Sequence, residues 1–221
     1  MPTPSGHVHL VDDSPDVRLH LGDLLRRLGY SVTAHSSAEE FFNAPTSGGP
    51  SMVLLDMRMP GVNGLHAQAR LATEKRPIPV VFISGESNLH EGIEAMKQGA
   101  VDFLCKPFGR EELVRAVDRA LEIDRQQQAT RQRRDDVQRR VAGLSARERE
   151  IFVLMLQGHP NRAIAEATGV QAGTIKKHRS AVLEKMEVST TAELMDLCRG
   201  LPLEQWGRAS PHGLAPATPH R

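Results

Sequence analysis

The sequence predicts two domains of different class: a doubly wound α/β domain with a five-stranded parallel sheet, and a separate all-α domain of four helices. Two observations predict this arrangement. Within residues 1–105, short apolar runs alternate with segments of helical periodicity, whereas residues 141–200 hold helical patterns and no strand signal. In addition, residues 1–120 carry a net negative charge and residues 121–200 a net positive charge, which indicates two separate tasks.

Five short apolar runs predict the strands. Two of them, Val53-Leu54-Leu55 and Val80-Val81-Phe82-Ile83, are continuous instead of alternating, as is typical of parallel strands buried on both faces. The first helical pattern follows Ser14-Pro15, which predicts an N-cap and a first-turn proline, and it ends at Gly29. The predicted strands are His7–Val11, Ser31–His35, Met52–Asp56, Val80–Ile83 and Asp102–Cys105.

The same patterns predict the domain boundaries. Residues 5–122 form the α/β domain and residues 141–200 the helical domain. Residues 201–221 contain four prolines and little apolar content, so we expect a disordered tail. Residues 123–140 hold a glutamine run and many arginines, which predicts a solvated linker, with a helical extension as the alternative.

Capping signals mark the helices of the second domain. Ser145 and Glu148 have the spacing of a capping box, and Asn161 and Thr190 are predicted N-caps of later helices. The longest predicted helix runs from about Ala172 to Met186.

Composition excludes several classes of protein. The net charge of +1 points to no partner, and no apolar run approaches the roughly 20 residues that span a bilayer. Because the N-terminus also lacks a signal-peptide core, we expect a cytoplasmic protein without membrane association. The two cysteines, Cys105 and Cys198, lack metal-site spacing and are predicted to be core residues.

Carboxylates follow two of the predicted strands. Asp12 and Asp13 follow the first strand, and Asp56 ends the third. With strand order 2-1-3-4-5, these strands are neighbours where the order reverses, which is where open parallel sheets bind ligands. Three clustered carboxylates repel one another unless a cation neutralises them, and hard oxygen ligands suit Mg²⁺. Ser84 ends the fourth strand and Lys106 follows the fifth, and both suit a bound phosphoryl group.

Five separated motifs resemble the receiver domain of response regulators across residues 5–122. Taken singly, each has a plain structural explanation, such as a charge at a helix N-terminus or a turn, but together and in this order they are a specific signal. The motifs are Val11-Asp12-Asp13, Asp56-Met57-Arg58-Met59-Pro60-Gly61 with Asn63-Gly64-Leu65, Ile83-Ser84-Gly85, Gly99-Ala100-Val101-Asp102-Phe103-Leu104, and Lys106-Pro107-Phe108.

The resemblance implies that Asp56 accepts a phosphoryl group from a partner histidine kinase. It also implies that Asp13, Asp56 and the backbone carbonyl of Arg58 ligate Mg²⁺, with Asp12 acting mainly through water. Mn²⁺ is expected to substitute for Mg²⁺ at such an oxygen site.

Further roles follow from the same resemblance. Lys106, joined to its proline by a cis peptide, would contact the phosphoryl oxygens, and Ser84 and Phe103 would carry the conformational switch. Many relatives have threonine where this chain has Ser84, which keeps the hydroxyl. Arg58 and Glu86 would border the path of hydrolytic water and modulate the lifetime of the phosphorylated state, their charges pairing across the site mouth; two solvated surface charges are the alternative.

An enzyme is the competing class of function. Phosphatases of the haloacid-dehalogenase type also use a strand-end aspartate with Mg²⁺, but they need a second aspartate two residues later, where this chain has Arg58. The sequence also lacks a G-x-x-x-x-G-K-[ST] phosphate loop and a G-x-S-x-G elbow. We therefore expect no catalysis beyond self-phosphorylation from a phosphodonor and autodephosphorylation at Asp56.

Helical geometry predicts the exposed face of the helix from about Ala172 to Met186. Placing Ile175 at the centre of the buried side puts Val182 on the same side. Residues in the first turns of an exposed face suit a reader of the DNA major groove, and Thr174, on the flank, suits a phosphate contact. The residues that point away from the core are Lys176, Lys177, Ser180 and Glu184.

This segment resembles the LuxR/FixJ-type DNA-binding domain across residues 141–199. For Arg179, packing or pairing within the domain is as plausible as a phosphate contact on DNA. The family pattern has a serine N-cap where this chain has Gln171, so the start of the recognition helix departs from it. The supporting motifs are Leu144-Ser145-Ala146-Arg147-Glu148-Arg149-Glu150, Asn161-Arg162-Ala163-Ile164-Ala165, and Thr174-Ile175-Lys176-Lys177-His178-Arg179 with Lys185-Met186.

Together the two resemblances predict a response regulator of the FixJ/NarL type in a two-component system. Its expected partners are a sensor histidine kinase, double-stranded operator DNA, RNA polymerase and a second copy of the chain on phosphorylation. Transcriptional activation is the expected outcome. One alternative is a phosphorylation-independent DNA-binding regulator with a relic receiver. A second alternative is a protein-interaction adaptor, and the exposed lysines of the recognition helix disfavour this second one.

Overall fold

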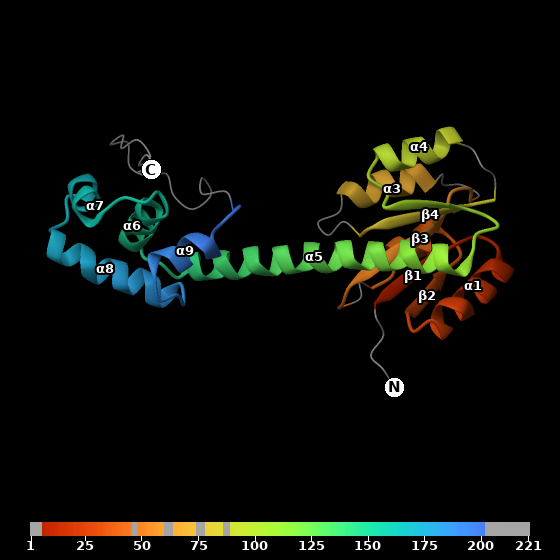
Figure 1. The fold of residues 1–221 in the computed structure, drawn as a ribbon, viewed down its shortest axis with the longest axis horizontal. Helices are drawn as coiled ribbons and strands as arrows, with labels where there is room; N and C mark the ends of the chain where they lie inside the picture. The colour runs from red at the N-terminus through yellow and green to blue at the C-terminus, as the bar shows by residue number, and fades with distance from the viewer. Residues whose placement is uncertain (1–5, 46–47, 60–63, 74–77, 86–88, 202–221) are drawn as a thin grey trace. The chain divides into compact units, whose positions relative to one another are not determined.

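A computed structural model of the chain describes residues 6–201, except 46–47, 60–63, 74–77 and 86–88. The chain divides into two compact units, Met1–Ala129 and Thr130–Arg221 (Figure 1). The division falls within the segment 123–140 that the sequence predicts as a linker. Of the tail 201–221 that is predicted to be disordered, residues 202–221 lie outside the described residues.

The first unit is built on a five-stranded parallel sheet of order β2-β1-β3-β4-β5. This is the predicted order, and β1 and β3 are neighbours at its reversal point, with Val11 opposite Leu55. The predicted strands are confirmed with bounds shifted by at most one residue. They are β1 (His7–Val11), β2 (Ser31–His35), β3 (Ser51–Asp56), β4 (Val80–Ser84) and β5 (Asp102–Cys105).

Helices cover both faces of the sheet, because alternate strand residues point to opposite sides and are apolar on both. On one side Leu10 and Leu54 pack against Leu25 and Leu113. On the other, Val53 and its neighbours pack against three shorter helices. The first face carries α1 (Pro15–Arg27) and α5 (Arg110–Ala142), and the second α2 (Ala38–Phe42), α3 (Gly64–Thr73) and α4 (Leu89–Lys97) (Figure 1).

Helix α5 is longer than the sequence indicates and includes the whole segment 123–140. The prediction of a solvated linker is therefore wrong at two positions, and the alternative, a helical extension, describes the segment. In the first unit Asp124 is fully buried and its Oδ2 accepts a hydrogen bond of 2.7 Å from the Ser51 N–H at the start of β3. In the second unit Val137 belongs to the hydrophobic core, together with Val141, which lies just after the segment.

The second unit packs α6 (Ala146–Leu156), α7 (Asn161–Thr168), α8 (Ala172–Lys185) and α9 (Thr191–Leu197) around one apolar core. The predicted capping box is confirmed, since Ser145 and Glu148 each bond the other's backbone N–H. The Thr190 cap is confirmed as well, with a bond of 3.1 Å from the Glu193 N–H. Asn161 is not a cap: Pro160, with φ −72° and ψ 161°, occupies that position and its carbonyl accepts the first helical bond, which leaves Asn161 inside the helix.

Cys198 is buried as predicted, but Cys105 is exposed. The reason is strand alternation at the sheet edge, because β5 pairs only with β4 among the described strands and Leu104 takes the core-facing position. Among the described residues no helix combines the length and the apolar character that a membrane span requires.

Candidate functional site

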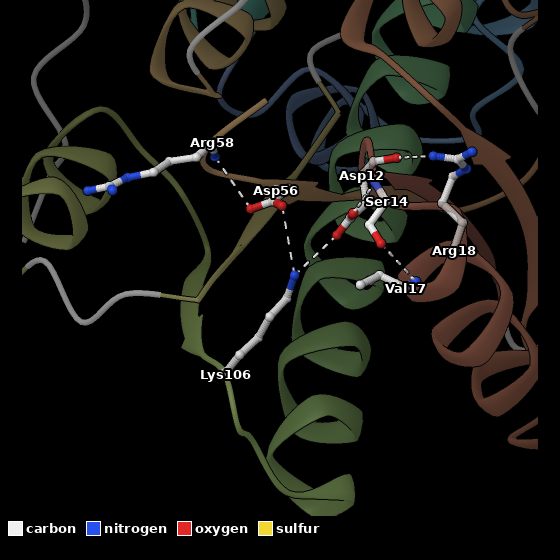
Figure 2. A network of polar contacts seen from close by, with 7 residues as sticks. All are labelled: Asp12, Ser14, Val17, Arg18, Asp56, Arg58 and Lys106. Carbon is white, nitrogen blue, oxygen red and sulfur yellow. Dashed lines mark hydrogen bonds and ion pairs between the residues drawn. The ribbon is translucent and has the colours of Figure 1, made fainter. Parts of the chain in front are cut away.

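The carboxyl edge of the sheet gathers the predicted acidic residues. Asp12 and Asp13 follow β1, and Asp56 is the last residue of β3, its neighbour. One carboxylate oxygen from each of the three lies within 4.8 Å of the others, and no other such group of His, Cys, Asp or Glu occurs among the described residues. Lys106, which follows β5, extends into the same cluster (Figure 2). The sequence prediction that these side chains meet is therefore correct.

Asp12 is fixed from three directions. It is completely buried, and its Oδ1 accepts a 2.9 Å hydrogen bond from the Ser14 N–H. Its Oδ2 lies 3.2 Å from the Lys106 Nζ, and its backbone carbonyl accepts a 2.6 Å bond from the Arg18 guanidinium (Figure 2). Ser14 is itself held as the N-cap of α1, since its Oγ accepts from the Val17 N–H at 3.4 Å. Buried carboxylates need such partners, so Asp12 is part of a rigid frame.

Asp56 is less enclosed and chemically more available. Its Oδ2 lies 3.8 Å from the Lys106 Nζ, and its Oδ1 accepts a long bond of 3.4 Å from the Arg58 N–H. Burial raises the pKa of Asp56, Lys106 acts in the opposite direction, and the negative charges of Asp12 and Asp13 add to the increase. A carboxylate with this surplus of neighbouring negative charge is stabilised by a cation, so the site favours binding one.

The predicted switch residues lie on β4, which neighbours the Asp56 strand, and on β5, the next strand in the sheet. Ser84, at the end of β4, is buried, and its carbonyl accepts a 2.7 Å bond from the Lys106 N–H. Phe103, on β5, is half-buried and packs against the core next to Gly92 of α4. The Lys106–Pro107 peptide is cis, as the resemblance implies. Ser84 and Phe103 therefore occupy neighbouring strands, with Ser84 bonded to the Lys106 backbone and Phe103 packed beside α4.

The Arg58 side chain does not point into the acidic cluster. It is exposed and extends away from Asp56 (Figure 2), and its Nη2 lies 3.4 Å from the Glu91 Oε1 on α4. Glu86, its predicted partner, lies outside the described residues, so that pairing stays a prediction. Glu91 was missed by sequence reasoning. Its one signal was an acidic residue in the first turn of a predicted helix, which usually needs no further explanation.

The exposed face of α8 is the second candidate site. Ile175 and Val182 are fully buried, as helical geometry predicts. The Ser180 hydroxyl donates to the Lys176 carbonyl at 3.1 Å, and Arg179 is half-buried and donates to the Thr191 Oγ1 at 2.8 Å. Burial lowers the pKa of Arg179. Most of the residues predicted to contact DNA are exposed: Thr174, Lys176, Lys177 and Ser180.

Comparison with known proteins agrees with both sites. Residues 8–118 match the response regulator receiver domain, and residues 142–198 match the bacterial regulatory proteins of the luxR family. The response regulator protein TodT of Pseudomonas putida is 35% identical over 188 residues, covering 85% of this chain and 83% of TodT. The chain belongs to the response regulators. FixJ of Azorhizobium caulinodans is also 35% identical over 188 residues, covering 85% of this chain and 89% of FixJ.

A solved response regulator has a similar fold. The low-resolution structure of StyR matches with a TM-score of 0.77 and 32% identity over 87% of this chain and 97% of StyR. The predicted fold class and family are thus confirmed: a receiver domain joined to a LuxR-type helix-turn-helix domain. A receiver domain implies a histidine kinase as partner, a LuxR-type domain implies DNA binding, and response regulators are in general not catalytic enzymes.

Proposed function

We propose that Asp56 is the phosphoacceptor of this response regulator and that its phosphorylation controls the binding of α8 to operator DNA. The observation that carries the proposal is the pairing of an accessible carboxylate with the Lys106 ammonium 3.8 Å away, inside a cluster of two further carboxylates. In the transfer, an Asp56 oxygen forms a bond to phosphorus while the phosphorus–nitrogen bond of the kinase phosphohistidine breaks and its electron pair returns to the imidazole. Lys106 then neutralises phosphoryl charge.

The acidic cluster fits Mg²⁺, or Mn²⁺ in its place. Asp13 and Asp56, with the backbone carbonyl of Arg58, would hold the ion directly and Asp12 through water, since converging oxygens are the ligands these cations prefer. The bound ion would supply positive charge against the phosphoryl oxygens. Asp12 is itself held in place by Lys106 and by the Ser14 N–H.

The phosphorylated receiver would then differ from the free one at Ser84 and Phe103. The Ser84 hydroxyl would move toward the phosphoryl oxygens and the Phe103 ring would turn inward, which favours a minor conformer over the major one. We propose that this conformer dimerises. A dimer would place two copies of α8 on a two-fold operator, which compensates for the modest charge of one domain.

On DNA, we propose that Lys176, Lys177 and Ser180 face the major groove and that Thr174 contacts a phosphate. The bond from Arg179 to Thr191 supports a packing role for Arg179 over a DNA contact. Transcriptional activation through contact with RNA polymerase is the outcome we expect.

The direct test is phosphorylation of the purified full chain with radiolabelled acetyl phosphate and Mg²⁺. The wild type should incorporate one base-labile phosphoryl group, as expected for an acyl phosphate, and Asp56→Asn, a nearly isosteric change, should incorporate none. Asp16→Asn, at an exposed position in the first turn of α1, is the matched control and should label normally. Normal labelling of Asp56→Asn would show that the phosphoacceptor is elsewhere. No labelling of the wild type, together with retained DNA binding in a mobility-shift assay, would favour the regulator with a relic receiver.

A further inference from the structure

An ion pair connects the loop that follows the phosphoacceptor to helix α4. The Arg58 Nη2 lies 3.4 Å from the Glu91 Oε1, with the two side chains 50% and 28% exposed. Arg58 is two residues after Asp56, and its backbone N–H already faces the Asp56 carboxylate. Its guanidinium points away from Asp56 and lies at Glu91 in this structure (Figure 2).

The two partners differ in how firmly they are held. Glu91 is in the first turn of α4, where the positive end of the helix dipole favours a negative charge. The Arg58 guanidinium is half-exposed at the end of a long side chain. The pair is weak enough to be exchanged, since exposed ion pairs contribute little.

Phosphorylation would change the competition for this arginine. A phosphoryl group on Asp56 replaces the single charge of the carboxylate with about 1.5 to 2 negative charges and adds three acceptor oxygens at the place that the Arg58 backbone already faces. The guanidinium, with its planar fork of donors, suits such a group. Among the described residues, Lys106 is the cationic side chain that pairs with Asp56. The Arg58 guanidinium would add a second positive charge at the phosphoryl group.

We propose that Glu91 is a positioning residue that holds the Arg58 guanidinium away from Asp56, and that it thereby shortens the lifetime of the phosphorylated receiver. This inference rests on the proposed function of Asp56. In autodephosphorylation a water oxygen forms a bond to phosphorus while the bond between phosphorus and the Asp56 oxygen breaks, which regenerates the carboxylate and releases inorganic phosphate. A guanidinium on the phosphoryl oxygens occupies the approach of that water, and Glu91 competes against this arrangement.

The test is the decay of the phosphorylated full chain after removal of acetyl phosphate, with Mg²⁺ present. Glu91→Gln should slow the decay about twofold to fivefold, the range that exchange of an exposed ion pair can produce. Glu94→Gln removes a charge from the same helix at an exposed residue whose contact is with Gln98, and it should decay like the wild type.

The same substitution is then made in an Arg58→Ala background, where the backbone carbonyl of residue 58 is retained. Here Glu91→Gln should leave the decay rate unchanged, because the side chain through which Glu91 acts is gone. A structural role of Glu91 at the start of α4 would persist in that background. Decay of Glu91→Gln at or above the wild-type rate, or an effect that persists without Arg58, overturns the inference while phosphorylation of Asp56 stands. Absence of labelling in the wild type would instead refute the proposed function, and this inference with it.

Discussion

The contact between Glu148 and Lys185 supports the position of the recognition helix, and Glu148→Gln tests it. The Glu148 carboxylate is 10% exposed and accepts 2.7 Å bonds from the Lys185 Nζ and from the Ser145 N–H. Glutamine keeps the shape and the carbonyl oxygen of the capping box but loses the charge. A hydrogen bond to a charged group contributes about 1.5–3 kcal/mol. Because Lys185 is 43% exposed and regains water, we expect a loss near the lower limit, about 1.5–2 kcal/mol.

The loss should depend on pH with a defined sign. The Lys185 hydrogen bond, followed by the Ser145 backbone bond, lowers the pKa of Glu148 from its ordinary 4.5 to about 2. A lowered acid pKa stabilises the folded state above the unfolded pKa, and this stability is lost as pH falls from about 4.5 toward 2. The difference between wild type and Glu148→Gln should thus be constant above about pH 5.5 and shrink below it.

Hydrogen exchange of the α6 and α8 amides in the full chain measures this difference for the second unit by itself. The matched control is Glu150→Gln, which breaks the more exposed pair with Arg147 on the same helix and should cost at most about 1 kcal/mol. Equal protection in the two variants, or a Glu148→Gln effect that is the same at pH 6 and pH 3.5, would refute the reasoning.

Three further predictions concern DNA binding by α8, the role of Ser84 in the conformational switch, and the buried Asp124 of α5. Lys177→Ala should weaken binding to the operator by about 1–3 kcal/mol more than binding to random DNA at fixed salt, whereas Thr174→Ala should weaken both alike; equal losses for Lys177→Ala would make it a phosphate contact. Ser84→Ala should still be labelled by acetyl phosphate but gain less operator affinity on phosphorylation than the wild type, as measured by fluorescence anisotropy; an equal gain would exclude the hydroxyl from the switch. Asp124→Ala should destabilise the first unit by about 1–3 kcal/mol, read from hydrogen exchange in β3, because the buried Ser51 N–H loses its acceptor; unchanged exchange would mean that another acceptor replaces it.

Local sequence signals were sufficient for the strands and for the residues at their ends. The continuous apolar runs of β3 and β4 require burial on both faces, and this implies a parallel sheet whose carboxyl edge collects Asp12, Asp13 and Asp56. The exposed face of α8 was predicted by the same kind of argument, because the buried position of Ile175 determines which side chains of the helix point to solvent.

The missed features depend on contacts between distant residues. Helix α5 has only Val137 and Val141 as buried apolar positions in its second half, which is too weak a stripe to separate a packed helix from a solvated one. Asp124 looks like any surface charge until its partner, 73 positions earlier in the sequence, is known. Glu91 is likewise 33 positions from Arg58, and only the packing of α4 brings the two together.

The measurement that tests the central claim most directly is the affinity of the full chain for its own operator with and without phosphorylation at Asp56. The operator is first selected from genomic DNA with the phosphorylated chain, and a second selection with the unphosphorylated chain avoids bias toward either state. Phosphorylated wild type should bind this DNA about 5- to 150-fold more tightly than the unphosphorylated chain, the range of a coupling free energy of about 1–3 kcal/mol. Asp56→Asn treated with the same phosphodonor should show the lower affinity throughout. Equal affinities for phosphorylated and unphosphorylated wild type, at a stoichiometry that shows complete labelling, would contradict the account.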